Sequence, residues 1–318
     1  MIASRPARLM AAAAREVCGA AVLTALTCAL ASCSASSPAR AHGSSPRPGP
    51  SGPRTPAART PAALTPASLT PGGRRAWMLT RAALGQVATE PAVLAGLQRS
   101  RVLEILQPGQ QPAAVAGADP VVTFSSVGEL SQAVPGGRLP AGTSALLYDP
   151  EAWSFTPRAE QLDPAGAAQR ARDIAHAHGM SLIVAPALNL TTLRPDPAGG
   201  PRWKQFLRLG LAGSIAKVTD VLEIQAQSLE RSTSTYAEFV RDAAAQARSA
   251  NPRVAILAGL STNPPGAPVT SQQLTAVIDA TRGMVDGYWL NIPGRGPRCP
   301  TCNSPRPDVG RAALRAAL

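Results

Sequence analysis

Short apolar runs alternate with helical patterns at a regular interval, and this alternation constrains the fold more than any other feature of the chain. From residue 102 onward, seven runs have the length and composition of buried strands. The last five begin 36, 40, 33 and 33 residues apart, about the length of one strand plus one helix. The predicted strands span residues 102–106, 121–124, 145–149, 181–185, 221–227, 254–258 and 287–291.

Helices are predicted between these strands, over residues 164–178, 203–217, 235–250 and 271–282, with a final helix from residue 307. Asp163-Pro164 is a typical helix start, and His178-Gly179 a typical helix end. Repeated βα units favour an α/β fold of the (β/α)8 TIM-barrel type. A doubly wound open sheet is the alternative, but no strand is followed by a glycine-rich phosphate-binding motif. The eighth strand lies around residues 77–80, or the barrel is incomplete.

The first 33 residues have the pattern of a bacterial targeting segment. Arg5, Arg8 and Arg15 precede an apolar stretch at 18–30 that is shorter than the roughly 20 residues of a membrane span. Leu30-Ala31-Ser32-Cys33 resembles the lipobox of bacterial lipoproteins. The resemblance implies that Cys33 carries the lipid and that the mature protein is anchored to the extracytoplasmic face of the cell membrane. Ordinary signal cleavage, which would give a secreted protein, is the alternative.

Residues 34–73 have the composition of a disordered linker. They include nine prolines and no acidic or aromatic residue. Such a segment buries too little apolar surface to offset its ordering entropy. We therefore expect a tether, followed by a folded, monomeric domain over 74–318.

The net charge of +12 does not by itself indicate a nucleic-acid partner. Half of the excess lies in the first 73 residues, outside the predicted domain. Only two of the 31 basic residues are lysines, Lys204 and Lys217, a bias typical of a GC-rich coding sequence. We expect no nucleic-acid binding.

Histidine chemistry is limited to His176 and His178 in the predicted domain. Two residues apart on a helix, they point in nearly opposite directions and cannot easily share a metal ion. A Ser-His-Asp system and a histidine-rich zinc site are therefore disfavoured. We expect no metal and no cofactor, and chemistry that depends on carboxylates, amides, hydroxyls and aromatic rings.

Polar and aromatic side chains follow several predicted strands, where a barrel would gather them at one mouth. The strand over 221–227 alternates, which places its three polar residues on one face. Carboxylates, amides and aromatic faces together suit a glycan or another small polar ligand. The candidate ligand-binding residues are Tyr148, Asp149, Glu151, Trp153, Asn189, Glu223, Gln225, Gln227, Trp289 and Asn291.

The stretch Tyr148-Asp149-Pro150-Glu151-Ala152-Trp153 resembles the end of the acidic strand in barrel glycoside hydrolases, especially the chitinase-like family with its D-x-x-D-x-D-x-E motif. The resemblance implies that Glu151 is the general acid and that Asp149 orients the acetamido group of the substrate. Ser144 and Leu147 replace the two earlier aspartates of the motif. In an ordinary two-carboxylate mechanism, Glu223 is the candidate partner. A non-catalytic barrel that binds carbohydrate or another ligand in the cell envelope is the alternative function.

The pair Cys299 and Cys302 lies in a loop rich in glycine and proline after the last predicted strand. A C-x-x-C pair can form a local disulfide, a redox site or half of a zinc site. The other three cysteines fall in the targeting segment, which leaves no second pair for zinc. In an oxidising compartment we expect a disulfide that staples the loop at the rim of the mouth.

Overall fold

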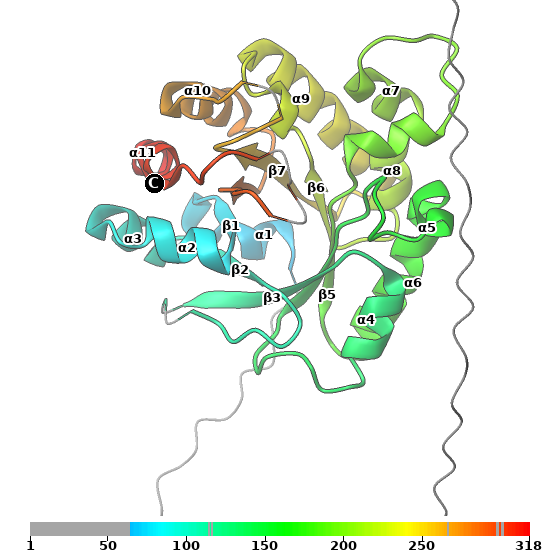
Figure 1. Cartoon of the computed structure of the whole chain (residues 1–318), viewed down its shortest axis with the longest axis horizontal. Coiled ribbons are helices and arrows are strands. Elements are labelled where there is room, and N and C mark those ends of the chain that lie inside the picture. The colour runs from blue at the N-terminus through cyan, green and yellow to red at the C-terminus, as the bar shows by residue number, and fades with distance from the viewer. Residues whose placement is uncertain (1–63, 114, 116, 266, 297–298, 300–301) are drawn as a thin grey trace, which may run out of the picture. The chain divides into compact units, whose positions relative to one another are not determined.

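Eight parallel strands close into a barrel in the computed structural model (Figure 1), which describes residues 64–113, 115, 117–265, 267–296, 299 and 302–318. The predicted targeting segment and residues 34–63 of the predicted linker lie outside these residues. Each strand pairs with the next, and β8 pairs back onto β1. The strands are β1 (Ala76–Thr80), β2 (Val102–Leu106), β3 (Ala118–Phe124), β4 (Ala145–Tyr148), β5 (Ser181–Val184), β6 (Val221–Ile224), β7 (Ala255–Ser261) and β8 (Gly287–Asn291). The predicted TIM barrel is confirmed, and the eighth strand is the first in the chain.

Helices surround the barrel, and the last one covers the seam where β8 meets β1. Helix α11 packs against α10 and against α2 and α3, as Figure 1 shows. The described residues between β2 and β3 contain no helix, unlike the other connections. The α-helices are α1 (Pro66–Leu69), α2 (Arg81–Val87), α3 (Pro91–Gln98), α4 (Val127–Ala133), α5 (Arg158–Leu162), α6 (Pro164–Ala177), α7 (Arg202–Arg208), α8 (Leu211–Ala216), α9 (Thr233–Ala250), α10 (Ser271–Thr281) and α11 (Pro307–Ala317).

Helix α6 begins and ends where its sequence predicts. The Asp163 side chain accepts a hydrogen bond from the Gly166 amide, and Pro164 occupies the first turn. At the other end, the amides of Gly179 and Met180 bond back to the carbonyls of His176 and Ala175. Gly179 has a φ of 70°, which its lack of a side chain permits.

Two predicted elements are interrupted. The helix expected over 203–217 is divided into α7 and α8 because Gly210 has a left-handed backbone, with φ 65°. The strand expected over 221–227 ends at Ile224, where the Ala226 amide turns back to the Ile224 carbonyl at 2.8 Å. Gln227 then begins a short 3-10 turn. Of the three polar residues predicted to share one strand face, only Glu223 lies within the strand.

Strand alternation produces two apolar regions. Side chains such as Leu146, Leu182 and Leu222 point outward and pack under the helices. Met78, Leu103 and others point inward and fill the barrel. Because each strand contributes to both regions, the barrel interior is packed up to the layer that carries the polar site.

The segment before β1 closes the amino-terminal end of the barrel. Leu64 and Leu69 are buried among the inward-pointing residues, and the Leu64 amide donates to Ser181 Oγ at 2.9 Å, at the start of β5. The packed chain therefore includes residues that composition assigns to the linker, and it begins before the boundary expected near Arg74.

Leu64 and Leu69 form an apolar plug at this end, and truncating it should destabilise the barrel. Leu69 is fully buried, so Leu69→Ala should lower the free energy of unfolding by about 2–4 kcal/mol, measured by urea denaturation. Leu162→Ala is the control, because Leu162 is 49% exposed and its loss should change stability by less than about 0.5 kcal/mol. Equal effects of the two changes would contradict a plug.

Candidate functional site

Asp149 and Glu151 lie at the mouth of the barrel, directly after β4. Inward and outward side chains alternate along this strand, so Leu147 and Asp149 point inward on either side of Tyr148. Asp149 is 7% exposed, and its Oδ1 accepts a hydrogen bond from Gln225 Nε2 at 2.9 Å. The same amide nitrogen donates to the Ala185 carbonyl, also at 2.9 Å. Gln225 therefore fixes Asp149 against the end of β5.

Tyr148 does not belong to the site, so its assignment to substrate binding is wrong. Its side chain is fully buried on the outer face of the barrel, where the hydroxyl donates to Glu160 Oε2 at 2.8 Å. Burial, and then the nearby Glu160 carboxylate, raise the pKa of Tyr148 above its usual range. The side chain links β4 to α5 and does not reach the mouth.

Glu151 is positioned by a residue that follows β5. Asn189 Nδ2 donates to Glu151 Oε2 at 3.3 Å, while Asn189 Oδ1 accepts from the Ala152 amide at 2.8 Å. Glu151 and Asn189, which were predicted separately as site residues, are thus brought together. Asn189 holds both the carboxylate and the backbone that carries it.

Glu223 lies below these groups, inside the barrel. It is fully buried, and neither carboxyl oxygen has a hydrogen-bond partner within the described residues. Burial raises its pKa well above the ordinary 4.5, and the charges of Asp149 and Glu151 raise it further. The three acidic groups therefore interact electrostatically, and the site favours the protonated form of Glu223.

Gly259, which is not among the predicted site residues, makes room for this arrangement. Glycine on β7 leaves open a position where a Cβ atom would lie 2.4 Å from both Glu223 Oε1 and Gln227 Nε2. A glycine inside an apolar strand is a signal for close approach of another group. The apolar strand β7 carries this signal at Gly259.

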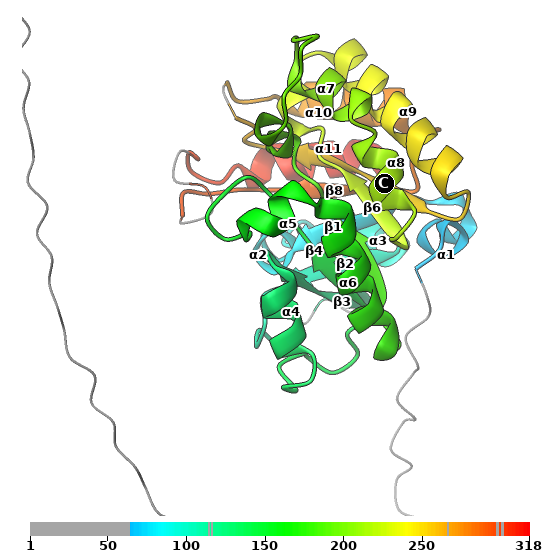
Figure 2. The same cartoon turned by 90° about the vertical axis from the view of Figure 1, so that its right-hand side faces the viewer.

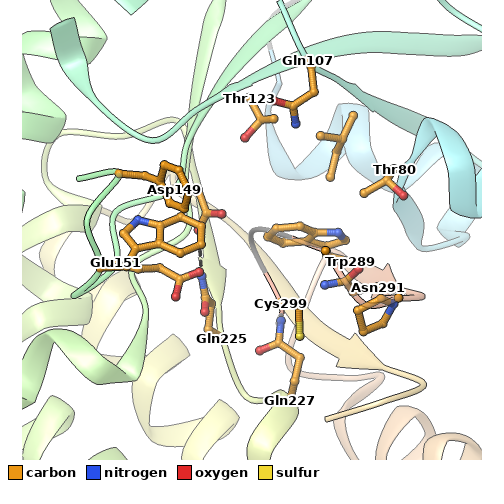
Figure 3. A pocket seen from close by; sticks show the side chains of 16 residues that line it. Thr80, Gln107, Thr123, Asp149, Glu151, Gln225, Gln227, Trp289, Asn291 and Cys299 are labelled. Atoms are coloured by element: carbon orange, nitrogen blue, oxygen red, sulfur yellow. Dashed lines mark hydrogen bonds between the residues drawn. The ribbon is translucent and has the colours of Figure 1, made fainter. Parts of the chain in front are cut away.

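Trp289 faces the carboxylates across the mouth, as Figure 3 shows. It lies on β8, in register with Met78 on one side and Gly259 on the other. Its side chain is mostly buried, and its Nε1 has no hydrogen-bond partner within the described residues. Asn291, two residues further along β8, lines the same cavity.

Two adjoining cavities form the mouth. The first has a volume of about 620 Å³, contains Asp149 and Trp289 in its wall, and extends to Trp153 and Phe155. The second, of about 580 Å³, extends past Asn189. Both volumes lie within the usual range of ligand pockets. The two share six wall residues, which are Glu151, Gln225, Gln227, Asn291, Pro293 and Cys299.

An aromatic pair forms one wall of the first cavity. The Trp153 and Phe155 rings meet edge to face, with centroids 5.1 Å apart. Trp153 Nε1 donates to Thr156 Oγ1 at 2.8 Å, which orients the indole. Phe155 is 43% exposed and, unlike Trp153, is not among the predicted residues. Thr80, Gln107 and Thr123, at the ends of β1 to β3, are further polar wall residues that the strand pattern does not identify.

Cys299 and Cys302 form a disulfide, as predicted. Cys299 lines both cavities and Cys302 lines the second, which places the stapled loop at the rim. Across the part of the chain that the structure describes, no group of three or more His, Cys, Asp or Glu residues is arranged to hold a metal ion. None of the described helices is both long enough and apolar enough to cross a membrane.

No protein-family model matches this chain, and no curated protein matches it in sequence. Several solved structures are similar to it at low identity. A chitinase from Chromobacterium violaceum is 13% identical, with a TM-score of 0.43, over 76% of this chain and 98% of the chitinase chain. The PgaB glycoside hydrolase domain from Bordetella bronchiseptica is 11% identical, with a TM-score of 0.43, over 76% and 98% of the two chains. A triosephosphate isomerase from Bartonella henselae is 12% identical, with a TM-score of 0.39, over 69% and 92%. The assignment of the barrel rests on its strand pairing and not on these similarities.

The protonation of Glu223 predicts a pH-dependent effect of Glu223→Gln. The pKa of Glu223 is higher in the folded protein than its ordinary value. The resulting contribution to the unfolding free energy is complete at pH values below the ordinary pKa, and it is lost as the pH rises toward the pKa of the folded protein. Glutamine cannot ionise, so the unfolding free energy of the variant relative to the wild type should increase between about pH 5 and pH 8, by about 1 kcal/mol or more. Urea denaturation at both pH values measures this difference.

The matched control is Asp308→Asn, which removes an exposed carboxylate at the start of α11. Its effect on stability should change much less between the two pH values. If Glu223→Gln changes the unfolding free energy equally at both pH values, Glu223 is already ionised in the folded protein.

Proposed function

We propose that this chain is a membrane-anchored, extracytoplasmic glycoside hydrolase that acts on an envelope or extracellular glycan. The observation that carries the proposal is the convergence of Asp149 and Glu151, from one strand end, on a cavity that faces Trp289. Carboxylates that flank an aromatic platform suit sugar binding and cleavage of a glycosidic bond. The resemblance of residues 148–153 to the chitinase-like motif supports the same reaction.

In this proposal Glu151 is the general acid. It lines both cavities, so it can reach a bond that joins a sugar in the first to a leaving group in the second. The acetamido oxygen of the bound sugar attacks the anomeric carbon, the glycosidic C–O bond breaks, and the leaving oxygen takes the Glu151 proton. Glu151 then accepts a proton from the water that opens the cyclic intermediate.

Asp149 orients and stabilises the acetamido group during these steps. Gln225 holds the Asp149 carboxylate, which makes Gln225 a positioning residue in addition to a wall residue of the cavity. Glu223 lines neither cavity, because the floor of the site covers it. Burial at this depth favours the substrate-assisted route over a direct attack by Glu223 in a two-carboxylate mechanism.

The described chain joins the barrel at the end opposite the mouth. The chain enters the barrel through α1 at the amino-terminal end, whereas the mouth lies at the carboxyl ends of the strands. Figure 2 shows α1 at the right of the barrel and the loops after β8 at the left. The point where a tether would join the barrel is therefore separate from the mouth.

Replacing Glu151 by Gln should abolish turnover and retain binding. Loss of a general acid typically lowers kcat by about 10²–10⁴-fold. The test compares hydrolysis of the hexamer of β-1,4-linked N-acetylglucosamine and of peptidoglycan strands, together with hexamer affinity by calorimetry. Glu238→Gln, on the surface helix α9, is the matched control and should leave both unchanged.

The same experiment distinguishes a hydrolase from the alternative, a non-catalytic binding protein. A wild-type protein that binds these glycans without cleaving them would be a non-catalytic binding barrel, in which Glu151→Gln only weakens affinity. Failure to bind or to cleave either glycan would contradict both functions.

The aromatic wall predicts a second effect. Phe155→Ala removes an exposed ring from the first cavity and should weaken hexamer binding about fivefold to tenfold, as expected for loss of a stacking contact. Leu162→Ala removes a similarly exposed apolar side chain that lines neither cavity, and it should have no effect on affinity. Equal losses in the two variants would place the glycan elsewhere.

A further inference from the structure

We propose that the amino-terminal end of the barrel, opposite the mouth, is a docking surface for an anionic phospholipid membrane. The surface is formed by Arg74, Arg75, Arg99, Lys217 and Arg253, which together are called the basic face here. The proposal concerns a different end of the molecule from the glycan site, and it does not require that the site be catalytic.

Strand topology brings these five residues to one end. Arg74 and Arg75 directly precede β1, and Arg99 lies three residues before β2. Lys217 lies four residues before β6, and Arg253 lies two residues before β7. Because all the strands are parallel, the segments that lead into them meet at the same end of the barrel. Strands β6, β7, β8, β1 and β2 are consecutive neighbours, so the basic face forms an arc along one side of that end.

The charges of the basic face are not neutralised by the carboxylates near it. Nearby carboxylates have other partners: Asp119 pairs with Arg101, Asp279 with Arg282 and Asp286 with Arg248, and Asp220 lies 2.8 Å from His176 Nε2. Within the described residues, none of the five basic-face cations forms an ion pair. Four of the five are exposed, and Arg75 is half-buried.

A small cavity on the basic face is suited to a phosphate headgroup. Its volume is about 230 Å³, and Arg74, Arg75, Arg282 and Ser100 line it together with Leu318, the last residue of the sequence. Arg75 Nε donates to the Arg282 carbonyl at 2.8 Å, which holds two arginine-bearing segments together. Guanidinium groups present several donors in one plane and bind phosphate oxygens well.

The path of the chain favours a membrane as the occupant. Leu64 is bound at this end of the barrel, and residues 34–63 connect it to Cys33, where the proposed lipid is attached. The basic face therefore lies at the end of the barrel where the described chain begins, on the side of the sequence that leads back to Cys33. Cations near an anionic bilayer are attracted within about one Debye length, and a basic patch is a common second signal beside a single lipid anchor.

Vesicle binding of the full chain tests this surface. The lipid is removed by Cys33→Ser, so that any binding depends on protein side chains. We expect this protein to sediment with vesicles of phosphatidylcholine containing about 30% phosphatidylglycerol, not with pure phosphatidylcholine, and to be released by about 0.5 M salt. Changing all five basic-face residues to Gln in the same background should lower the partition coefficient at least tenfold.

The control replaces five exposed cations elsewhere by Gln, namely Arg81, Arg158, Arg170, Lys204 and Arg231, and so removes the same net charge. Binding within about twofold of the parent is expected, because these residues lie away from the basic face. Equal loss in both variants would show that net charge alone governs binding, and absence of binding by the parent would also overturn the proposal. Hydrolysis of the glycan hexamer by both variants separates this outcome from failure of the proposed function.

Discussion

Pairing of β8 with β1 is the interaction on which the site depends. Met78 and Trp289 are partners across this seam, and Trp289 is in turn the partner of Gly259. Closure of the sheet turns a row of strand ends into a ring, so that residues far apart in sequence face a common centre. An open sheet with the same strands would leave Trp289 at one edge, remote from Asp149.

The cost of burying Glu223 is reduced by its neutral form. An ionised carboxylate in a dry barrel is very unfavourable, whereas a protonated one loses much less on burial. Gly259 gives the carboxyl group space, and the charges of Asp149 and Glu151 oppose its ionisation. The arrangement therefore favours the uncharged form of Glu223 beneath Asp149 and Glu151.

The barrel could be predicted because the positions and spacings of the strands in the sequence are nearly the same in the folded protein. Breaks within a single helix or strand cannot be predicted from the hydrophobic pattern alone. Gly210 divides a helix whose apolar period continues through it, and the turn at Ala226 ends a strand whose alternation continues to Gln227. Tyr148 is predicted to line the mouth as an aromatic stacking surface, next to Asp149 in the sequence. Neighbouring strand residues point to opposite faces, so the assignment of both to one mouth conflicts with the alternation itself.

Other features could not be read from composition. Leu64 and Leu69 lie in a proline-rich stretch, and only the open end of a barrel provides apolar partners for them. The contacts of Gln225 with Asp149 and of Asn189 with Glu151 join different strand ends, and their distances depend on closure of the sheet. Pattern identifies which residues are polar at the strand ends, whereas tertiary geometry decides which of them touch.

The two ends of the barrel have different chemistry because one apolar interior separates them. At the mouth, acidic and amide groups gather around Trp289, and at the other end arginines surround the entry of the chain. Between them lie inward-pointing residues such as Leu103, Val121 and Leu257, which are close-packed and carry no polar side-chain group. A substitution on the basic face therefore has no polar route through the barrel to Glu151. Residues at the two ends can accordingly change independently in this fold.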